Sequence, residues 1–180
     1  MNLTVKITDL PREGIELPLE IPVEKGQGRL NEVERELISL VSPITGRIRL
    51  EPTGRRVVAR GKIEARLRAE CSRCLEEFEF PVSEEIFLIF SPHPETGFQE
   101  ELEAEALDMD YYAGDEIDLW PVIQEHLFLG LPIKLLCRED CQGLCPDCGQ
   151  NRNLRPCKCS VSRKASGLAA LMKIRDKLPS

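Results

Sequence analysis

The chain has few histidines, few aromatic residues and no long apolar run. Only two of its 180 residues are histidine, which is the commonest general acid or base in enzymes. Aromatic residues make up 5% of the chain, so the core must be mainly aliphatic. No apolar run reaches the roughly 18 residues that a membrane-spanning helix needs, and we therefore expect no association with a membrane.

The first residues also lack an export signal. Met1–Lys6 contains neither an apolar segment nor a small-residue cleavage site. We therefore expect a cytoplasmic protein in a reducing compartment. Cysteines stay reduced there, and closely spaced pairs of them are typical of metal ligands rather than of disulfides.

The apolar content of 42% is enough for one core. Gly61–Cys71 alternates strictly between apolar and charged residues, which predicts an antiparallel strand with one buried face. An apolar run follows directly, so we expect a hairpin whose turn is Cys71–Cys74. Weaker patterns predict three more strands: Leu3–Ile7, Ile15–Ile21 and Ile44–Leu50.

Helical periodicity is clearest over Asp118–Leu129, where Asp118 is a candidate N-cap. A second helix is expected over Ser166–Leu178. Gly26–Gly28 predicts a turn, and the acidic, proline-containing residues 92–116 predict a loop.

These patterns predict an α+β fold. We expect an antiparallel β body, which could close into a barrel, with one or two helices and a C-terminal cysteine-rich zinc module. The expected boundaries are residues 1–136 for the body, including the helix at 118–129, residues 137–159 for the zinc module and residues 160–180 for a basic tail or helix.

The eight cysteines are spaced as metal ligands rather than scattered. Two Cys-x-x-Cys pairs and one Cys-x-Cys pair each let a short turn present two thiolates to one ion. The clustered four make the natural local site: Cys145, Cys148, Cys157 and Cys159. The remaining four would make a second site that joins the hairpin turn to the segment after the helix: Cys71, Cys74, Cys137 and Cys141. Spacing leaves one alternative open, in which Cys137 and Cys141 share an ion with Cys157 and Cys159.

Zinc is therefore the expected cofactor, with two structural ions. Four thiolates around each ion leave no open position for water or a substrate. His93-Pro94-Glu95 has the form of one half of a zinc deaminase signature, but the matching half is not found. Ferredoxin spacings are absent, and Cys71–Cys74 joins two strands instead of opening a helix as a redox pair does. We expect no enzymatic activity and no small-molecule substrate.

Charge is unevenly distributed along the chain. The net charge is −7, but residues 150–180 contain eight Lys or Arg and one acid, so this segment carries +7 and the rest −14. A basic end on an acidic body favours anionic partners such as RNA. Five of these cations are our candidate nucleic-acid contacts: Arg152, Arg155, Lys158, Arg163 and Lys164.

Three segments carry a resemblance to a known family. Cys71-Ser72-Arg73-Cys74-Leu75-Glu76 follows the alternating strand, Ile117-Asp118-Leu119 precedes the helix, and Cys141-Gln142-Gly143-Leu144-Cys145-Pro146-Asp147-Cys148-Gly149 comes after it. With this order, roughly residues 1–178 resemble the YceD family. The chain departs from the family near its end, where Ala165-Ser166 replaces the usual acidic-proline pair.

The resemblance implies a cytoplasmic role in ribosome assembly and in accumulation of the large-subunit (23S) ribosomal RNA, without an assigned enzymatic activity. It suggests pre-ribosomal RNA, a ribosomal protein or an assembly protein as the partner. Some members of the family lack the later cysteines, which suggests that the local site supports structure or docking. The alternative is a zinc module that binds another protein and makes no direct RNA contact.

Overall fold

The structure is a computed structural model that describes residues 3–93 and 109–159. It is α+β, as predicted, and its strands are mostly antiparallel. Among the described residues, three α-helices accompany the strands. The elements in chain order are β1 (Thr4–Lys6), a 3-10 turn (Ile7–Asp9), β2 (Ile15–Ile21), α1 (Val23–Arg29), α2 (Glu32–Leu37), β3 (Ser39–Leu40), β4 (Ile44–Thr53), β5 (Arg56–Glu70), β6 (Glu77–Pro92), β7 (Met109–Tyr112), β8 (Glu116–Asp118) and α3 (Trp120–Leu129).

A six-stranded sheet forms the body of the described residues, in the order β2-β4-β5-β6-β7, with β3 paired to β5. The strands β1 and β8 form a separate two-stranded ribbon. The sheet does not close into a barrel, because β2 and β7 remain at opposite edges. The barrel form of the prediction was therefore wrong. A single parallel pair, β6 with β7, departs from the antiparallel pattern.

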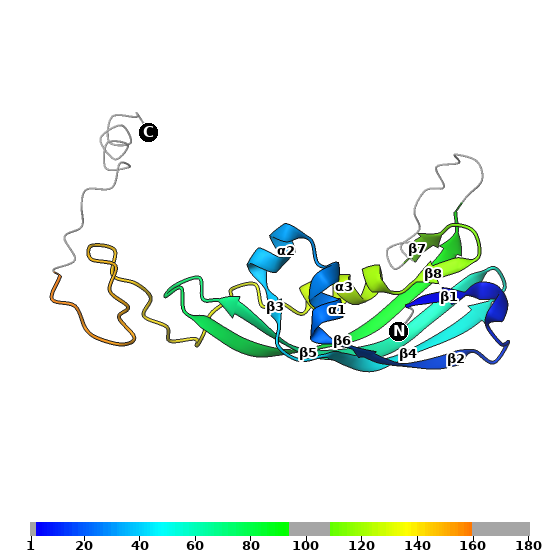
Figure 1. Ribbon diagram of the computed structural model, residues 1–180, viewed down its shortest axis with the longest axis horizontal. Coiled ribbons are helices and arrows are strands. Elements are labelled where there is room, and N and C mark those ends of the chain that lie inside the picture. Colours follow the sequence, from blue (N-terminus) through cyan, green and yellow to red (C-terminus); the bar gives the residue numbers. More distant parts are fainter. Residues whose placement is uncertain (1–2, 94–108, 160–180) are drawn as a thin grey trace, which may run out of the picture.

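The long hairpin β5–β6 is the central element of the sheet. Its inward residues alternate with charged ones, as the sequence predicted, and Ile63 and Leu67 are fully buried. The two strands stay paired from Val57↔Phe90 to Glu70↔Glu77. Because pairing continues to the last residue before Cys71, the turn that carries Cys71 and Cys74 lies at the tip of a stiff two-stranded arm (Figure 1).

All three helices cover the same face of the sheet (Figure 1). Ile123 and Leu127 of α3 are buried in one core with the inward residues of the strands. The N-cap of α3 is Leu119, and not Asp118 as the sequence predicted. Asp118 lies one residue earlier and accepts a hydrogen bond from the backbone N–H of Trp120 at 3.0 Å, so it still satisfies one of the free donors at the start of α3. The opposite face of the sheet carries no helix among the described residues.

Two local predictions were wrong. Gly26–Gly28 lies inside α1 and is not a turn. A Cβ at Gly26 would approach the Leu40 Cδ1 to 2.6 Å, so this glycine lets the helix pack closely on the body. Residues 109–112 form a strand inside the predicted loop 92–116, and a second strand, 116–118, begins at the last residue of that loop. The first pairs with β6, the preceding strand, and the second with β1, near the start of the sequence.

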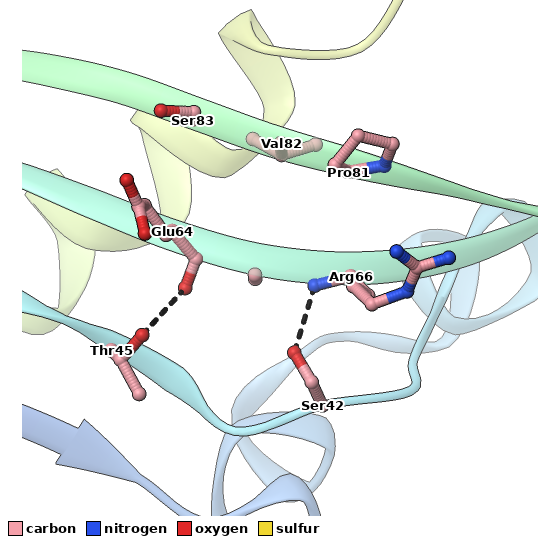
Figure 2. A pocket seen from close by; sticks show the side chains of 8 residues that line it. Ser42, Thr45, Glu64, Arg66, Pro81, Val82 and Ser83 are labelled. Carbon is pink, nitrogen blue, oxygen red and sulfur yellow. Dashed lines mark hydrogen bonds between the residues drawn. The ribbon is translucent and has the colours of Figure 1, made fainter.

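The open face of the sheet holds a shallow groove of about 390 Å³. Figure 2 shows that it lies beside β5, between the contact of Thr45 with Glu64 and the contact of Ser42 with Arg66. The Ser42 hydroxyl accepts a hydrogen bond from the backbone N–H of Arg66 at 2.9 Å. The remaining walls come from three strands: Thr45, Glu64, Ala65, Pro81, Val82 and Ser83.

Within the described residues, no helix is both long enough and apolar enough to span a bilayer. The predicted helix at 166–178 and the basic tail at 160–180 lie outside the described residues.

Candidate metal centres

The cysteines gather into two groups of four sulfurs, and in each group all sulfurs lie within 4.8 Å of one another. The first group, called the bridging site below, joins the hairpin tip to the segment after α3: Cys71, Cys74, Cys137 and Cys141. The second, called the local site, lies in the module that follows: Cys145, Cys148, Cys157 and Cys159. These are the two groups that the spacing favoured, and the alternative pairing of Cys137 and Cys141 with Cys157 and Cys159 does not form.

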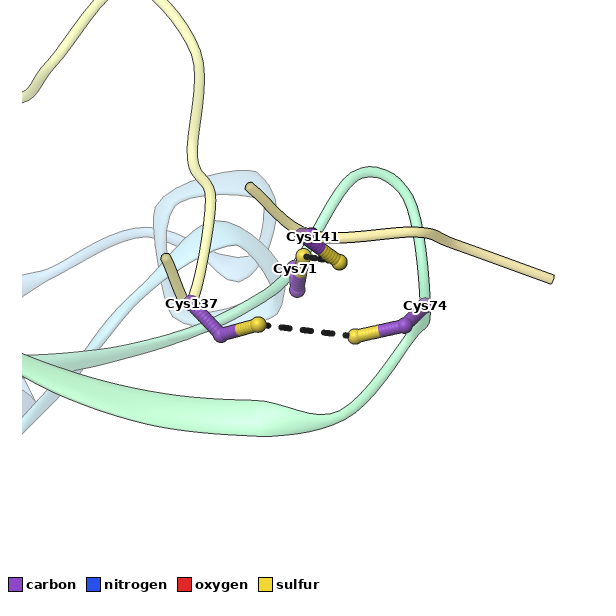
Figure 3. Close-up of side chains that lie close together, drawn as sticks. All are labelled: Cys71, Cys74, Cys137 and Cys141. Carbon is purple, nitrogen blue, oxygen red and sulfur yellow. Dashed lines mark hydrogen bonds between the residues drawn. The ribbon is translucent and has the colours of Figure 1, made fainter. Parts of the chain in front are cut away.

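The sulfur separations in the bridging site fit a tetrahedral ion. The Sγ atoms of Cys71 and Cys141 are 3.8 Å apart, and those of Cys74 and Cys137 are 3.7 Å apart (Figure 3). Four ligands at about 2.3 Å from a central zinc lie about 3.8 Å from one another. A disulfide would need about 2.05 Å, and all eight cysteines are free. The donor set therefore fits zinc, with all four positions taken by sulfur.

Burial makes the bridging site part of the body. Cys71 is fully buried, and Cys74 and Cys141 are each 4% exposed. Phe78 of β6 and Leu136 pack against the three sulfurs. An ion held there is shielded from water by apolar side chains, and its ligands come from two segments more than sixty positions apart in sequence.

The hairpin tip has the backbone geometry of a metal-binding turn. The N–H of Leu75 donates to the carbonyl of Cys71 at 2.9 Å, and the N–H of Cys71 donates to the carbonyl of Glu76 at 2.9 Å. Leu75 has a φ of 61°, in the left-handed region that favours glycine. Gly149 follows the Cys145–Cys148 pair in the same way with a φ of 71°. The two Cys-x-x-Cys turns thus share one shape, but only one has a glycine at the strained position.

Arg73, between the two tip cysteines, fastens the later segment to the hairpin. Its guanidinium donates to the carbonyls of Cys141 at 2.9 Å and Glu139 at 3.3 Å. Its own carbonyl accepts from the N–H of Leu144 at 2.9 Å. A Cβ at Gly143, whose φ is 67°, would stand 2.9 Å from that carbonyl oxygen, so only glycine permits this approach.

Asn153 connects the two sites. Its Nδ2 donates to the Cys141 Sγ at 3.3 Å, and its Oδ1 accepts from the backbone N–H of Gln142 at 2.8 Å. The Asn151 Oδ1 holds Asn153 in place by accepting from its backbone N–H and from its Nδ2. A hydrogen bond to a ligand sulfur stabilises the thiolate form and orients it.

The local site is more open to solvent than the bridging site. Cys145 is buried, whereas Cys148 is exposed. Its frame consists of short-range backbone bonds, such as those from the N–H of Gly149 to the Cys145 carbonyl and from the N–H of Cys145 to the Gln150 carbonyl. This site therefore depends on a few residues of its own module.

The pKa values of the thiols are split within each site. Burial opposes ionisation of Cys71, but the backbone N–H groups of Cys137, Arg73 and Cys74 outweigh it and lower the pKa of Cys71 to about 6. In contrast, burial and the neighbouring sulfurs raise the pKa of Cys137 to about 12.

The local site repeats this split. Backbone N–H groups of Cys148 and Asp147 lower the pKa of Cys145 to about 7. The Cys148 side chain and then burial raise the pKa of Cys159 to about 12. Four clustered sulfurs cannot all become anions without a cation, and a divalent ion supplies that charge.

The candidate nucleic-acid contacts divide between the described and undescribed parts of the chain. Three of them are exposed within the local site's stretch of chain. Arg152 and Arg155 lie between Cys148 and Cys157, and Lys158 lies between Cys157 and Cys159. Arg163 and Lys164 lie outside the described residues.

Of the two histidines, His126 is on α3 and bonds through its Nδ1 to the carbonyl of Val122 at 2.9 Å, so it packs along its own helix.

Sequence reasoning did not identify Arg73, Gly143 or Asn153 as parts of the sites. Gly143 was visible only as one residue of the Cys141–Cys145 segment. The hydrogen bonds of Arg73 join positions more than sixty residues apart in the chain. Those of Asn153 depend on the shape of the turns around it. No pattern of residue types predicts either set.

Comparisons with known proteins found one matching family and several similar proteins. Residues 59–175, more than half of the chain, match the family described as "Large ribosomal RNA subunit accumulation protein YceD". This segment contains all eight cysteines. An Arabidopsis thaliana protein named "Large ribosomal RNA subunit accumulation protein YCED homolog 1, chloroplastic" is 33% identical over 63 residues, which cover 35% of this chain and 20% of that protein.

Mycobacterial proteins are similar over longer stretches. An uncharacterized protein of Mycobacterium tuberculosis is 31% identical over 102 residues, covering 57% of this chain and 48% of that protein. An uncharacterized protein of Mycobacterium leprae is 28% identical over 139 residues, which cover 76% of this chain and 62% of that protein. The chain thus spans about half the length of the first of these curated relatives. No solved structure matches the chain.

Proposed function

The chain belongs to the YceD family, and from that premise we propose that it is a non-enzymatic, cytoplasmic factor that supports accumulation of large-subunit (23S) ribosomal RNA during ribosome biogenesis. It does so by binding pre-ribosomal RNA directly. Two structural zinc ions, one in each site, hold the RNA-binding module on the β body. The observation that carries this proposal is the pair of four-sulfur groups beside a cluster of exposed cations.

The role of zinc follows from its ligands. Four sulfurs complete the tetrahedron, so no position remains for a bound water or a substrate oxygen, and the ion acts as a cross-link. In the bridging site this cross-link fastens residues 137–159 to the hairpin tip. The module of residues 137–159 is therefore a unit that depends on metal for its attachment, and the basic segment 160–180 continues from it.

RNA contact is assigned to the cations of this module. Arg152, Arg155 and Lys158 lie within or beside the turn of the local site, which limits their freedom before RNA arrives. Arg163 and Lys164 extend the same basic stretch in sequence. Cations fixed in this way neutralise phosphates and release counterions, so the resulting binding weakens as salt is raised.

The first test is metal content. We expect two zinc ions per chain in protein purified under reducing conditions without chelator. A Cys71→Ser variant and a Cys148→Ser variant should each retain one. A wild-type protein that is folded and free of zinc would contradict the proposal.

The second test is RNA binding against salt concentration, with and without zinc. An Arg152→Ala/Arg155→Ala variant should bind a 23S precursor transcript more weakly than wild type, with a salt slope smaller by roughly 1.4, about 0.7 for each single-strand phosphate lost. Arg66→Ala/Arg68→Ala is the matched control, because both arginines face Glu79 on the sheet. If the wild-type protein binds no RNA but co-purifies with a ribosomal protein after ribonuclease treatment, the protein-binding alternative replaces this proposal.

A further inference from the structure

Four cations lie next to one another on the open face of the sheet, well away from the cysteine sites. They are called the cationic quartet below: Arg47, Arg49, Arg60 and Lys62. In the register of β4 with β5, Arg47 is directly opposite Lys62 and Arg49 is directly opposite Arg60. All four side chains are exposed.

This arrangement is unfavourable for the folded protein alone. Like charges directly opposite each other on neighbouring strands destabilise a sheet. Arg49 and Lys62 have carboxylate partners on their own strands, Glu51 at 2.6 Å and Glu64 at 2.7 Å. Arg47 and Arg60 form no ion pair within the described residues. The structure therefore holds two like-charged pairs together and leaves one cation of each pair available to an external anion.

An aromatic ring adjoins the quartet. Phe87 of β6 is opposite Arg60 in the register, and its side chain is 45% exposed. The guanidinium carbon of Arg60 lies 5.2 Å from the ring centroid. The guanidinium lies over the ring, so an unstacked nucleobase can stack on the part of the ring that stays exposed or on the plane of the guanidinium.

The surroundings limit the cationic surface to the centre of the sheet. Glu16 on β2 is opposite Arg49, and Glu85 on β6 is opposite Lys62. Carboxylates therefore flank the quartet on the neighbouring strand at each side. Along β5, Glu64 separates Lys62 from Arg66 and also lines the groove of Figure 2. Since the helices lie on the other face, no described element covers this strip (Figure 1).

We propose that the cationic quartet and Phe87 form a second RNA-binding site, in which phosphates of a single strand contact Arg47 and Arg60 and one base stacks on Phe87. The proposal rests on the proposed function, in which RNA is the ligand. A single strand is the occupant because stacking on Phe87 needs a base that is not already paired and stacked. Duplex binding would use the phosphates alone.

The two RNA contacts can be separated by mutation because they are far apart. Lys62 and Cys71 are nine residues apart on β5 and its tip, a distance of about 30 Å along an extended strand. A strand of RNA that reached from the module to the quartet would contact both surfaces of one protein. Binding would then be stronger than at either surface alone.

The test uses the full zinc-loaded chain and a fluorescein-labelled uridine RNA of about 20 nucleotides, followed by fluorescence anisotropy over a range of salt. Arg47→Ala/Arg60→Ala should weaken binding about tenfold at roughly 0.1 M salt and lower the salt slope by about 1.4. The control Arg66→Ala/Arg68→Ala removes the same number of cations from the same face, and it should change affinity less than about twofold because both arginines lie beside the carboxylate of Glu79, which offsets part of their charge.

The aromatic contact has its own signature. Phe87→Ala should weaken binding about tenfold without changing the salt slope, because a ring carries no charge. Ile89→Ala, two residues along on the same strand, is the control and should have little effect. Replacing the RNA by an RNA duplex of the same length should abolish the difference between Phe87→Ala and wild type.

The outcomes separate this inference from the proposed function. If wild-type protein binds RNA and only the Arg152→Ala/Arg155→Ala variant loses affinity, the sheet site is overturned and the proposed function stands. If Arg47→Ala/Arg60→Ala and Arg66→Ala/Arg68→Ala weaken binding equally, the total charge of the sheet explains the effect and the quartet is not a site. If wild type binds no RNA, both proposals fail.

Discussion

The two cysteine sites have the same four ligands but different places in the molecule. The bridging site is buried and draws its ligands from the hairpin tip and from a segment beyond α3. The local site is partly exposed, and its ligands fall within one short stretch. An ion held in the bridging site would fasten two parts of the fold, whereas an ion held in the local site would shape one turn.

The length of chain that each ion would close into a loop gives an estimate of how much more the bridging site stabilises the fold. Cys74 and Cys137 are separated by 63 positions, whereas Cys148 and Cys157 are separated by 9. Loop-closure entropy grows with the logarithm of length, so closing the longer loop restricts the unfolded chain by about 1.7 kcal/mol more. Burial adds to this, since a vacated bridging site would leave sulfurs in an apolar pocket. The global stability of the fold should thus depend on the bridging site first.

The largest expected effect comes from Cys71→Ser. This variant should lose the buried ion and lower the free energy of unfolding by about 4 kcal/mol, the value of a cross-link that closes a loop of this length. Urea unfolding of the zinc-loaded protein measures it. Cys148→Ser is the control: it also loses one ion but should lower the free energy of unfolding by only about 2.5 kcal/mol, the value for a loop of nine residues. Equal losses would remove the distinction between the sites.

The next largest effect is expected at Gly143, which lies between the two sites in the sequence and packs against the backbone of Arg73. Gly143→Ala should destabilise the protein by about 2 kcal/mol, because it adds backbone strain to a clash with the Arg73 carbonyl oxygen. Gly149→Ala has the same positive φ but no atom within 4 Å of the added Cβ, so strain alone should cost about 1 kcal/mol. Thermal unfolding of the two variants compares them. A larger effect at Gly149 would contradict the close approach at Arg73.

A smaller effect is expected at Asn153. Asn153→Ala removes the hydrogen bond to the Cys141 Sγ and should weaken zinc binding at the bridging site about tenfold, the lower end of the range for the loss of such a partner. Asn153→Asp should weaken it further, because a carboxylate would face a thiolate. Competition with a colorimetric chelator measures the affinity. Unchanged zinc affinity in both variants would show that the bond has no influence on the metal.

The smallest effect has the opposite sign. Leu75→Gly should raise the free energy of unfolding by about 0.5–1 kcal/mol, because glycine adopts the φ of 61° without the strain of a Cβ. Leu75 is 54% exposed, so little packing is lost. Leu75→Ala keeps the strain and should bring no gain. A stabilisation by alanine as large as that by glycine would mean that the leucine side chain, and not the backbone, was unfavourable.

Sequence reasoning succeeded where the information is local. Strict alternation over Gly61–Cys71 predicted the strand and its buried face, because the period of side chains in a strand is two. The Cys-x-x-Cys turn at its end followed from the same pattern. It failed at β7, whose composition is that of a loop, and at β8, whose partner β1 lies more than a hundred positions away in the sequence.

What the sequence by itself determined is the chemistry: eight closely spaced thiols without an acid–base partner, an aliphatic core and a basic end on an acidic body. Only the tertiary structure decided which sulfurs lie together, because the pairing of β5 with β6 and the packing of α3 on the sheet bring the two halves of the bridging site to one place. The cationic quartet has the same origin. Arg49 and Arg60 become neighbours through the register of two strands, and register is set by the burial of one whole face rather than by either residue.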